Sequence, residues 1–201
     1  MKPIQSLKTI VAAGIIGITS AIATPVNFNQ AELTTDAGND NRVRFTTVHS
    51  LDLEDGLQIH YHGLHEMQLN NTNTYNGINF ASVGTSNARF GSRFITDKNG
   101  IKNGGFGIRN ESLINKIADY GYVEATTTGT TSNIRFFAGY VLGKGKTLEI
   151  FTSQNFGQGK PSNWTEIQIY QDLTKNLAIS ARLEINNGQK VTPIASLLYK
   201  F

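Results

Sequence analysis

The arginines of this chain occupy one side of an alternating pattern that recurs in short segments. In residues 176–185, NLAISARLEI, every second residue from Leu177 onward is apolar, whereas Arg182 and Glu184 stand between them. A period of two is typical of a β-strand, whose successive side chains point to opposite faces. The guanidinium is a planar fork of donors that stays charged and binds carboxylates or phosphates through two parallel hydrogen bonds. We therefore predict a solute-binding face for anions, formed by Arg42, Arg44, Arg89, Arg93, Arg109, Arg135 and Arg182.

The other charged residues are sorted as well. The lysines after residue 23 fall in turn-like segments, in a helix-like stretch at residues 110–118 or at strand ends. Four glutamates share the arginine face, and they are Glu124, Glu149, Glu166 and Glu184. Seven arginines against four glutamates predict an excess of three positive charges on this face.

The elements that must position these side chains are short strands. Clusters of Gly, Asn, Asp, Ser and Pro, the residues of turns, interrupt the chain repeatedly. Alternating runs rich in β-branched and aromatic residues lie between them, and a weak run at residues 28–35 brings the predicted number to twelve. Ten strands remain an alternative, because the first two runs are the weakest. An even number of antiparallel strands in one domain suits a closed barrel.

The first residues are typical of an export signal. Two lysines precede fifteen uncharged residues that close on Ala21-Ile22-Ala23. We therefore predict a cleaved signal peptide at residues 1–23 and a single barrel domain at residues 24–201. The remaining chain is nearly neutral and has no cysteine. This composition argues against a nucleic-acid partner and excludes a disulfide framework. The chain after residue 23 has no apolar run long enough for a membrane helix. If it spans a membrane, it must therefore do so as a β-barrel.

The last segment carries an uninterrupted apolar face. Counting back by twos from the final residue gives Phe201, Tyr199, Leu197, Ala195, Pro193 and Val191. This strand resembles the C-terminal strand of bacterial outer-membrane β-barrels. Its terminal Phe, preceded by apolar residues at every second position, resembles the signal that the barrel-assembly machinery reads. The resemblance implies an all-β fold, a transmembrane antiparallel β-barrel of about twelve strands surrounded by lipid in the outer membrane of a Gram-negative bacterium. The arginine pattern is similar to that of small twelve-stranded porins for acidic oligosaccharides and sialic acids, whose lumens are lined by arginine tracks.

Two functional classes are compatible with these features. The first is a porin-like channel for passive diffusion of small, preferentially anionic solutes such as acidic sugars, with no cofactor. The second is a closed structural or surface-interaction barrel, whose lumen is zipped shut by Arg–Glu pairs. The longest predicted loops, at residues 96–105 and 153–163, span about ten residues, and such short loops favour transport over adhesion. A soluble β-sandwich is the alternative fold.

Other candidate sites are weak. His60 and His62 share a face and His65 lies on the opposite one, so the histidines form an incomplete metal shell and no metal is predicted. Serine, histidine and acidic residues are too scattered for a catalytic triad, so no enzymatic activity is predicted. Four aromatic residues on inward or rim positions could stack on sugar rings, but a girdle at the rim is the favoured interpretation for Phe137, Phe151, Trp164 and Tyr170.

Overall fold

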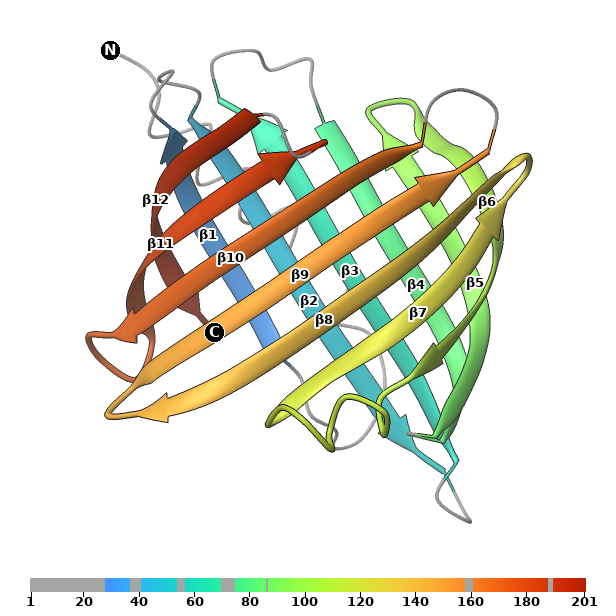
Figure 1. Ribbon diagram of the computed structural model, residues 1–201, viewed down its shortest axis with the longest axis horizontal. Helices are drawn as coiled ribbons and strands as arrows, with labels where there is room; N and C mark the ends of the chain where they lie inside the picture. The colour runs from blue at the N-terminus through green and yellow to red at the C-terminus, as the bar shows by residue number, and fades with distance from the viewer. Residues whose placement is uncertain are drawn as a thin grey trace.

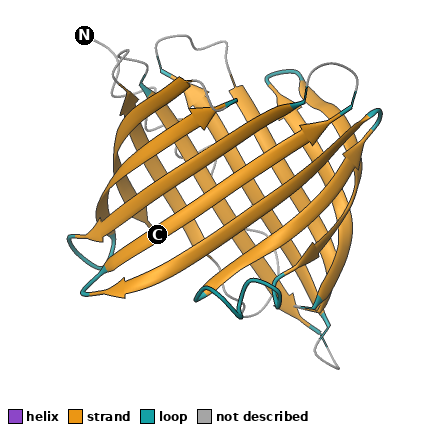
Figure 2. Cartoon of the chain, viewed as in Figure 1, coloured by secondary structure: helices purple, strands orange, loops and turns teal. Residues whose placement is uncertain are grey.

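The chain folds into a barrel of antiparallel strands (Figure 1 and Figure 2). The computed structural model describes residues 28–36, 41–53, 57–69, 75–85, 87–157, 161–187 and 190–201. The predicted signal peptide lies outside these ranges. Within them the strands are β1 Phe28–Asp36, β2 Arg42–Asp52, β3 Gln58–Gln68, β4 Tyr75–Thr85, β5 Ala88–Asp97, β6 Gly100–Asn110, β7 Tyr120–Thr128, β8 Thr131–Gly143, β9 Lys146–Phe156, β10 Ser162–Asp172, β11 Leu177–Asn186 and β12 Lys190–Lys200.

The sheet closes between its first and last strands. Each strand pairs with its neighbours in sequence, and β1 pairs with β12 from Gln30 opposite Lys200 to Asp36 opposite Ile194. Closure satisfies every strand edge, which is the only way a sheet can reside in lipid. The prediction of an all-β, twelve-stranded antiparallel barrel is confirmed, and both the ten-strand count and the β-sandwich are wrong.

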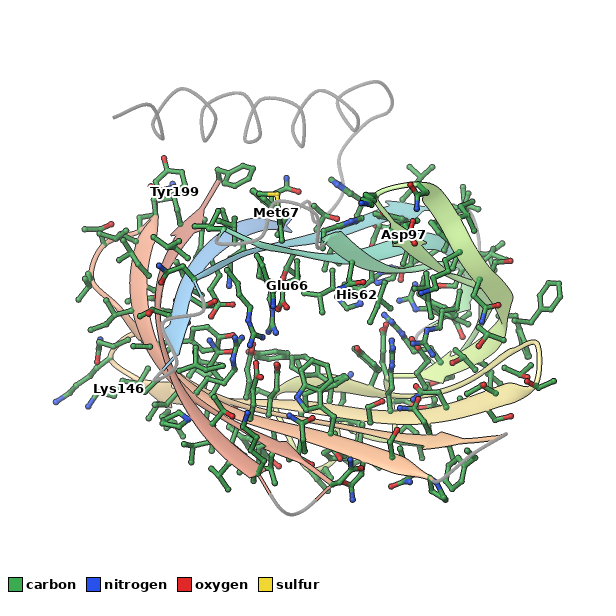
Figure 3. The ribbon with its side chains drawn as sticks, turned by 90° about the horizontal axis from the view of Figure 1, so that it is seen from above. His62, Glu66, Met67, Asp97, Lys146 and Tyr199 are labelled. Carbon is green, nitrogen blue, oxygen red and sulfur yellow. The ribbon has the colours of Figure 1, made fainter. Side chains whose placement is uncertain are left out.

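Strand alternation separates an apolar outer face from a polar lumen. In β12, Leu197 and Tyr199 are about half exposed, whereas Leu198 between them is fully buried. In β11, Ile179 and Leu183 face outward and Arg182 faces the lumen. Figure 3 shows the same division, with Met67 and Tyr199 outside the wall. This apolar outer surface is the one a transmembrane barrel presents to lipid.

The outer face of β2–β4 carries polar side chains, unlike the mostly apolar outer face of the other strands. His60 and His62 line the lumen, so the residues between and after them, Tyr61 and His65, lie on the outer face, as the alternation predicts. There the Tyr61 hydroxyl donates to Asn79 Oδ1 at 2.6 Å. Gly63 lies among these side chains. A Cβ at this glycine would stand 2.8 Å from the Tyr61 hydroxyl.

One predicted loop is a tight hairpin. Residues 96–105 contain a Gly/Asn-rich run that is typical of a loop, yet β5 continues to Asp97 and β6 begins at Gly100. Asp97 Oδ1 accepts from the Asn99 backbone N–H at 2.7 Å, and Gly100 has a φ of 111°, which glycine tolerates. The prediction of a long loop here is wrong. Pairing with β5 supplies the backbone hydrogen bonds that the weak strand propensity of this run does not suggest.

The helix-like stretch forms turns between β6 and β7. The Asn115 N–H donates to the Glu111 carbonyl at 3.1 Å, and the Ala118 N–H donates to the Ile114 carbonyl at 3.0 Å. Ile114 is buried against Gly121, where an added Cβ would approach its Cγ2 to 2.6 Å. This segment lies at the barrel end that also holds the C-terminus (Figure 1). No helical segment in the described ranges has the length and apolarity that a membrane crossing demands.

Candidate functional site

The structure places the seven arginines on the lumen side of the wall. All except Arg42 are buried, and Arg109 and Arg182 are only 2% and 1% exposed. They come from β2, β5, β6, β8 and β11 and form two groups within the barrel. The charged interior is wrapped by strands whose other face is mostly apolar, so each guanidinium must find its partners inside.

The predicted charge excess is wrong. Besides the four predicted glutamates, three more carboxylates reach lumen arginines, and these belong to Glu32, Glu66 and Glu111. The described lumen therefore holds seven glutamates beside its seven arginines. Sequence alternation did not assign these three residues to the lumen face. Glu32 lies in the weakly alternating run 28–35, Glu66 follows the run 56–63, and Glu111 lies in the helix-like stretch 110–118.

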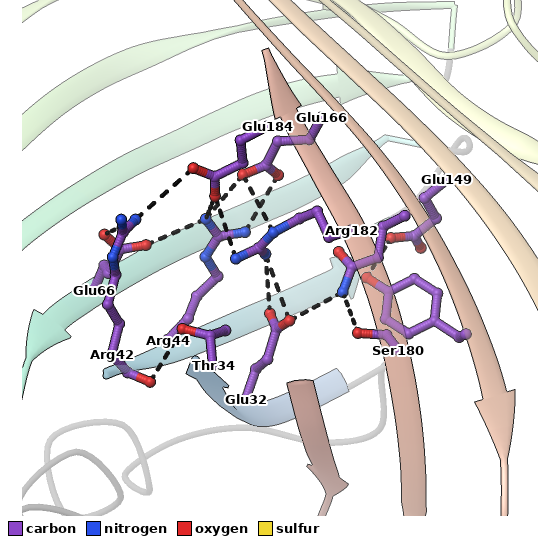
Figure 4. Close-up of polar contacts among 12 residues, drawn as sticks. Glu32, Thr34, Arg42, Arg44, Glu66, Glu149, Glu166, Ser180, Arg182 and Glu184 are labelled. Carbon is purple, nitrogen blue, oxygen red and sulfur yellow. Dashed lines mark hydrogen bonds and ion pairs between the residues drawn. The ribbon is translucent and has the colours of Figure 1, made fainter. Parts of the chain in front are cut away.

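The first group, the Arg44 cluster, joins opposite walls of the barrel (Figure 4). Arg44 of β2 binds Glu166 of β10 through two parallel contacts, with Nη1–Oε2 and Nη2–Oε1 distances of 3.2 and 2.9 Å. Its Nη2 also contacts Glu66 Oε2 at 3.2 Å. Three strands of the wall separate β2 from β10, so this pair crosses the lumen.

Arg182 completes the Arg44 cluster. Its Nη1 lies 3.4 Å from Glu32 Oε2, and its Nη2 lies 3.3 Å from Glu184 Oε1. The Gln168 amide donates to Glu32 at 2.9 Å and to the Ser180 hydroxyl at 2.7 Å. The full cluster has three arginines and four glutamates: Arg42, Arg44, Arg182, Glu32, Glu66, Glu166 and Glu184.

The second group, the Arg109 cluster, is built around the Arg109 guanidinium, which has partners on several sides. Arg109 donates to Glu124 Oε2 from Nη2 at 2.6 Å and from Nε at 3.1 Å. Its Cζ stands 3.9 Å from the ring centre of Tyr122, and Nη1 and Nη2 each lie 3.4 Å from a ring nitrogen, of His60 and His62 respectively. These contacts occupy both the edge and the face of the Arg109 fork.

The other arginines of the Arg109 cluster have fewer partners. Arg93 Nη1 donates to the Thr126 hydroxyl at 2.9 Å, and no described carboxylate lies within ion-pair distance of Arg93. Arg135 has one ion pair, a 3.5 Å contact with Glu124. Including Arg89, which is paired with Glu111, the cluster holds four arginines and two glutamates. Positive charge therefore predominates on this side of the lumen, although the totals balance.

A carboxylate between the clusters is held by hydroxyl groups alone among the described residues. Glu149 accepts from the Tyr120 hydroxyl at 2.6 Å and from the Tyr170 hydroxyl at 2.7 Å. Tyr120 reaches it across β8 because Gly139 has no side chain. A Cβ there would lie 2.1 Å from the Tyr120 ring. The glycine is what permits this contact.

A cavity of about 650 Å³ lies between the two clusters. Its lining includes Arg44, Arg109 and Arg135, and Figure 3 shows His62 and Glu66 pointing into the same lumen. Much of its wall is aromatic. The residues interpreted from sequence as a rim girdle line this cavity instead, together with three further rings: Phe80, Tyr120, Tyr122, Phe137, Phe151, Trp164 and Tyr170.

The lumen histidines do not form a catalytic or metal site with the described residues. The Ser50 hydroxyl and His60 Nδ1 are 2.8 Å apart, but His60 Nε2 faces Arg109, where a triad would place an acid. In the parts of the chain that the structure describes, no three His, Cys, Asp or Glu side chains converge as a metal ion requires.

Comparison with known proteins identifies the fold. No family model and no curated protein matches the chain. A solved KdgM porin in complex with disordered oligogalacturonate is 11% identical, covers 87% of this chain and 98% of its own, and has a TM-score of 0.55. Another KdgM porin structure gives 11% identity, 87% and 99% coverage and a TM-score of 0.52. The outer membrane phospholipase A of Escherichia coli gives 10% identity, 92% and 95% coverage and a TM-score of 0.48. This chain has the fold of the outer-membrane β-barrels.

Proposed function

We propose that the protein is a porin-like channel of the bacterial outer membrane, for passive diffusion of small, preferentially anionic solutes such as acidic sugars. The observation that carries this proposal is the unbalanced positive charge of Arg93 and Arg135 next to a lumen cavity of about 650 Å³. The oligogalacturonate in the similar KdgM structure is an acidic sugar, which supports the solute class.

The physical basis is the small width of the path. Fixed charges act over a screening length of about 8 Å at physiological salt, which is comparable with the lumen of a small barrel. Arg135 lines the cavity, and its one ion pair to a described residue is a 3.5 Å contact from Nη1 to Glu124. A carboxylate that passes here exchanges water for guanidinium donors. The five other arginines are predominantly paired with glutamates. In this proposal they shape the electrostatic field of the lumen and do not bind the solute directly.

A closed structural barrel is the second candidate function. Arg44 and Glu166 span the lumen, and Arg109 ties β6 to the histidines of β3. Such bridges fill a barrel with polar contacts, and a barrel closed by them has no continuous path for solutes. The two candidates differ in one observable, which is conductance.

The test is the reversal potential of the protein in a planar bilayer under a potassium chloride gradient. We expect stable conductance with a potential of the sign for anion preference. Changing Arg93→Gln and Arg135→Gln together should shift this potential toward zero, because these residues carry the unbalanced charge. The matched control, Lys144→Gln with Lys146→Gln, removes the same charge from an exposed turn at the rim and should shift it far less. Absence of conductance supports the closed barrel, and cation preference contradicts the proposal.

The cellular location and biogenesis are part of the same proposal. Processing after Ala23, insertion by the barrel-assembly machinery through the strand that ends at Phe201, and surrounding outer-membrane lipid accord with the barrel fold. Cell fractionation tests them together with a gel of boiled and unboiled protein. Recovery in the soluble periplasmic fraction, with a band unshifted by boiling, would contradict this part of the proposal.

A further inference from the structure

The cavity has an aromatic row on one wall, made of two pairs of contacting rings. Tyr122, Phe137 and Phe151 stand directly opposite one another on β7, β8 and β9. The ring centres of Tyr122 and Phe137 are 5.5 Å apart, and Trp164 of β10 extends the row with its ring centre 5.5 Å from that of Phe151. The rings of the two pairs are inclined to each other by 40° and 73°, so the row presents faces and edges of rigid apolar rings to a ring-shaped solute.

A guanidinium lies beside this row. Arg135 precedes Phe137 by two residues on the same face of β8, which places the two side chains roughly 7 Å apart along the strand. Among the described residues, Arg135 makes a single ion pair, a 3.5 Å contact from Nη1 to Glu124, and it lines the cavity. A carboxylate bound to Arg135 therefore carries its attached ring toward Phe137 and Phe151.

The polar groups next to the aromatic row are already engaged. The hydroxyls of Tyr120 and Tyr170 donate to Glu149, and the Gln168 amide donates to Glu32 and Ser180. Sugar hydroxyls would meet few available partners on this wall, and desolvating a hydroxyl without replacing its hydrogen bonds is unfavourable. An aromatic ring needs no such partners.

The charges on the two sides of the row are of opposite sign. Arg135 stands on one side, whereas Glu149 faces the position of Gly139, two residues beyond Phe137 on the other. A solute with one carboxylate can turn that group to Arg135 and its ring to the aromatic wall. A solute with a second carboxylate on its far side would bring it toward Glu149, which is unfavourable.

We propose that this cavity binds aromatic monocarboxylates, with the carboxylate on Arg135 and the ring against Phe137 and Phe151, in preference to sugar acids. The inference rests on the proposed channel function, since solutes reach the cavity through the lumen. Among the anionic solutes of that channel, it assigns to this cavity a preference for apolar-ringed anions, whereas acidic sugars would pass it without being held.

The experiment measures binding of benzoate, acetate and galacturonate to the purified protein in detergent. Trp164 is the only tryptophan of the chain and lines the cavity, so its fluorescence reports occupancy, and titration calorimetry gives an independent affinity. We expect benzoate to bind about tenfold more tightly than acetate, which lacks the ring, and galacturonate, which carries hydroxyls. Equal or tighter binding of galacturonate would overturn the inference.

Two variants test the two halves of the site. Arg135→Gln should weaken benzoate binding about tenfold, which is the effect of losing a charge-assisted hydrogen bond. Phe137→Leu should weaken benzoate binding while leaving acetate binding unchanged. Lys146→Gln, which removes one positive charge at the rim, is the matched control and should alter neither. Unchanged benzoate affinity in both site variants would contradict the site, provided that each variant keeps the heat-shifted gel mobility of the folded barrel.

Conductance measured on the same preparations separates the two proposals. If the channel conducts with anion preference but does not favour benzoate, the aromatic site is wrong and the porin function stands. If benzoate binds as expected but no conductance is seen, the binding site stands and the porin function is wrong.

Discussion

The guanidinium of Arg44 and the carboxylate of Glu166 face each other across the lumen in a two-point contact of 2.9 and 3.2 Å. Both side chains are buried. The pair therefore joins two walls that the backbone hydrogen bonds of the sheet connect only through the intervening strands.

Removing one partner of this pair should destabilise the barrel and widen its lumen. Glu166→Gln leaves Arg44 with fewer carboxylates, and breaking a buried ion pair on one side costs about 3–5 kcal/mol. We expect a lower urea midpoint for unfolding and a larger single-channel conductance. The double variant Arg44→Gln with Glu166→Gln should recover part of the stability, because it leaves no unmatched charge from the pair. Additive losses in the double-mutant cycle would show that the two residues do not act as a pair.

Gly139 should be intolerant of even a methyl group. Gly139→Ala places a Cβ where the Tyr120 ring now lies, so the ring must move and its bond to Glu149 must break. Forcing a side chain into a filled site costs about 1–3 kcal/mol, which equilibrium unfolding in urea would detect. Gly104→Ala is the control, because the only neighbour of its Cβ is 3.9 Å away, and it should leave the midpoint within error. Equal losses in both variants would contradict the packing argument.

A charge on the outer surface should cost more at mid-height than at the rim. Ile167 lies in the centre of β10 on the outer face, whereas Val191 lies near one end of β12. Ile167→Arg should lower the free energy of unfolding in lipid vesicles by about 2–4 kcal/mol, and Val191→Arg by about 1 kcal/mol or less. The same small cost at both positions would indicate that this face is not in contact with hydrocarbon.

The anion preference should decline as salt rises. The screening length falls from about 10 Å at 0.1 M to about 3 Å at 1 M, so the field of Arg93 and Arg135 no longer spans the path. Reversal potentials measured with the same concentration ratio at low and high mean salt check this. A preference that is independent of salt would point instead to a size or binding effect.

Much of the barrel can be predicted from the sequence, because a strand between lipid and a polar lumen must alternate apolar and polar side chains. The period of two predicts the strands from β2 to β12, although it misses the first half of β6, and it sorts the two faces: Arg182 inward and Ile179 outward in β11, His62 inward and His65 outward in β3. The charged side chains of the strands follow this pattern because an exchanged face would put charge in hydrocarbon.

The partners of the lumen residues were not readable in this way. Closure of the sheet brings Arg44 opposite Glu166, which follows it by 122 residues, and no local pattern encodes that meeting. Glu111 reaches Arg89 from a turn segment, to which strand alternation does not apply. The sequence therefore predicts which side chains face the lumen far better than how their charges cancel.

The seam between β1 and β12 makes the folded state depend on strands that are far apart in the sequence. Glu32 and Arg182 meet beside this seam although 150 residues separate them, and β1 finds its second partner strand only in the last residues. Contacts of such sequence separation form late, because a long loop must first be closed. A chain interrupted before β12 would keep two open sheet edges and leave Thr34 and Leu33 without their partners on that strand. The closing pair thus couples the two strands that lie furthest apart in the sequence, since neither can complete its pairing without the other.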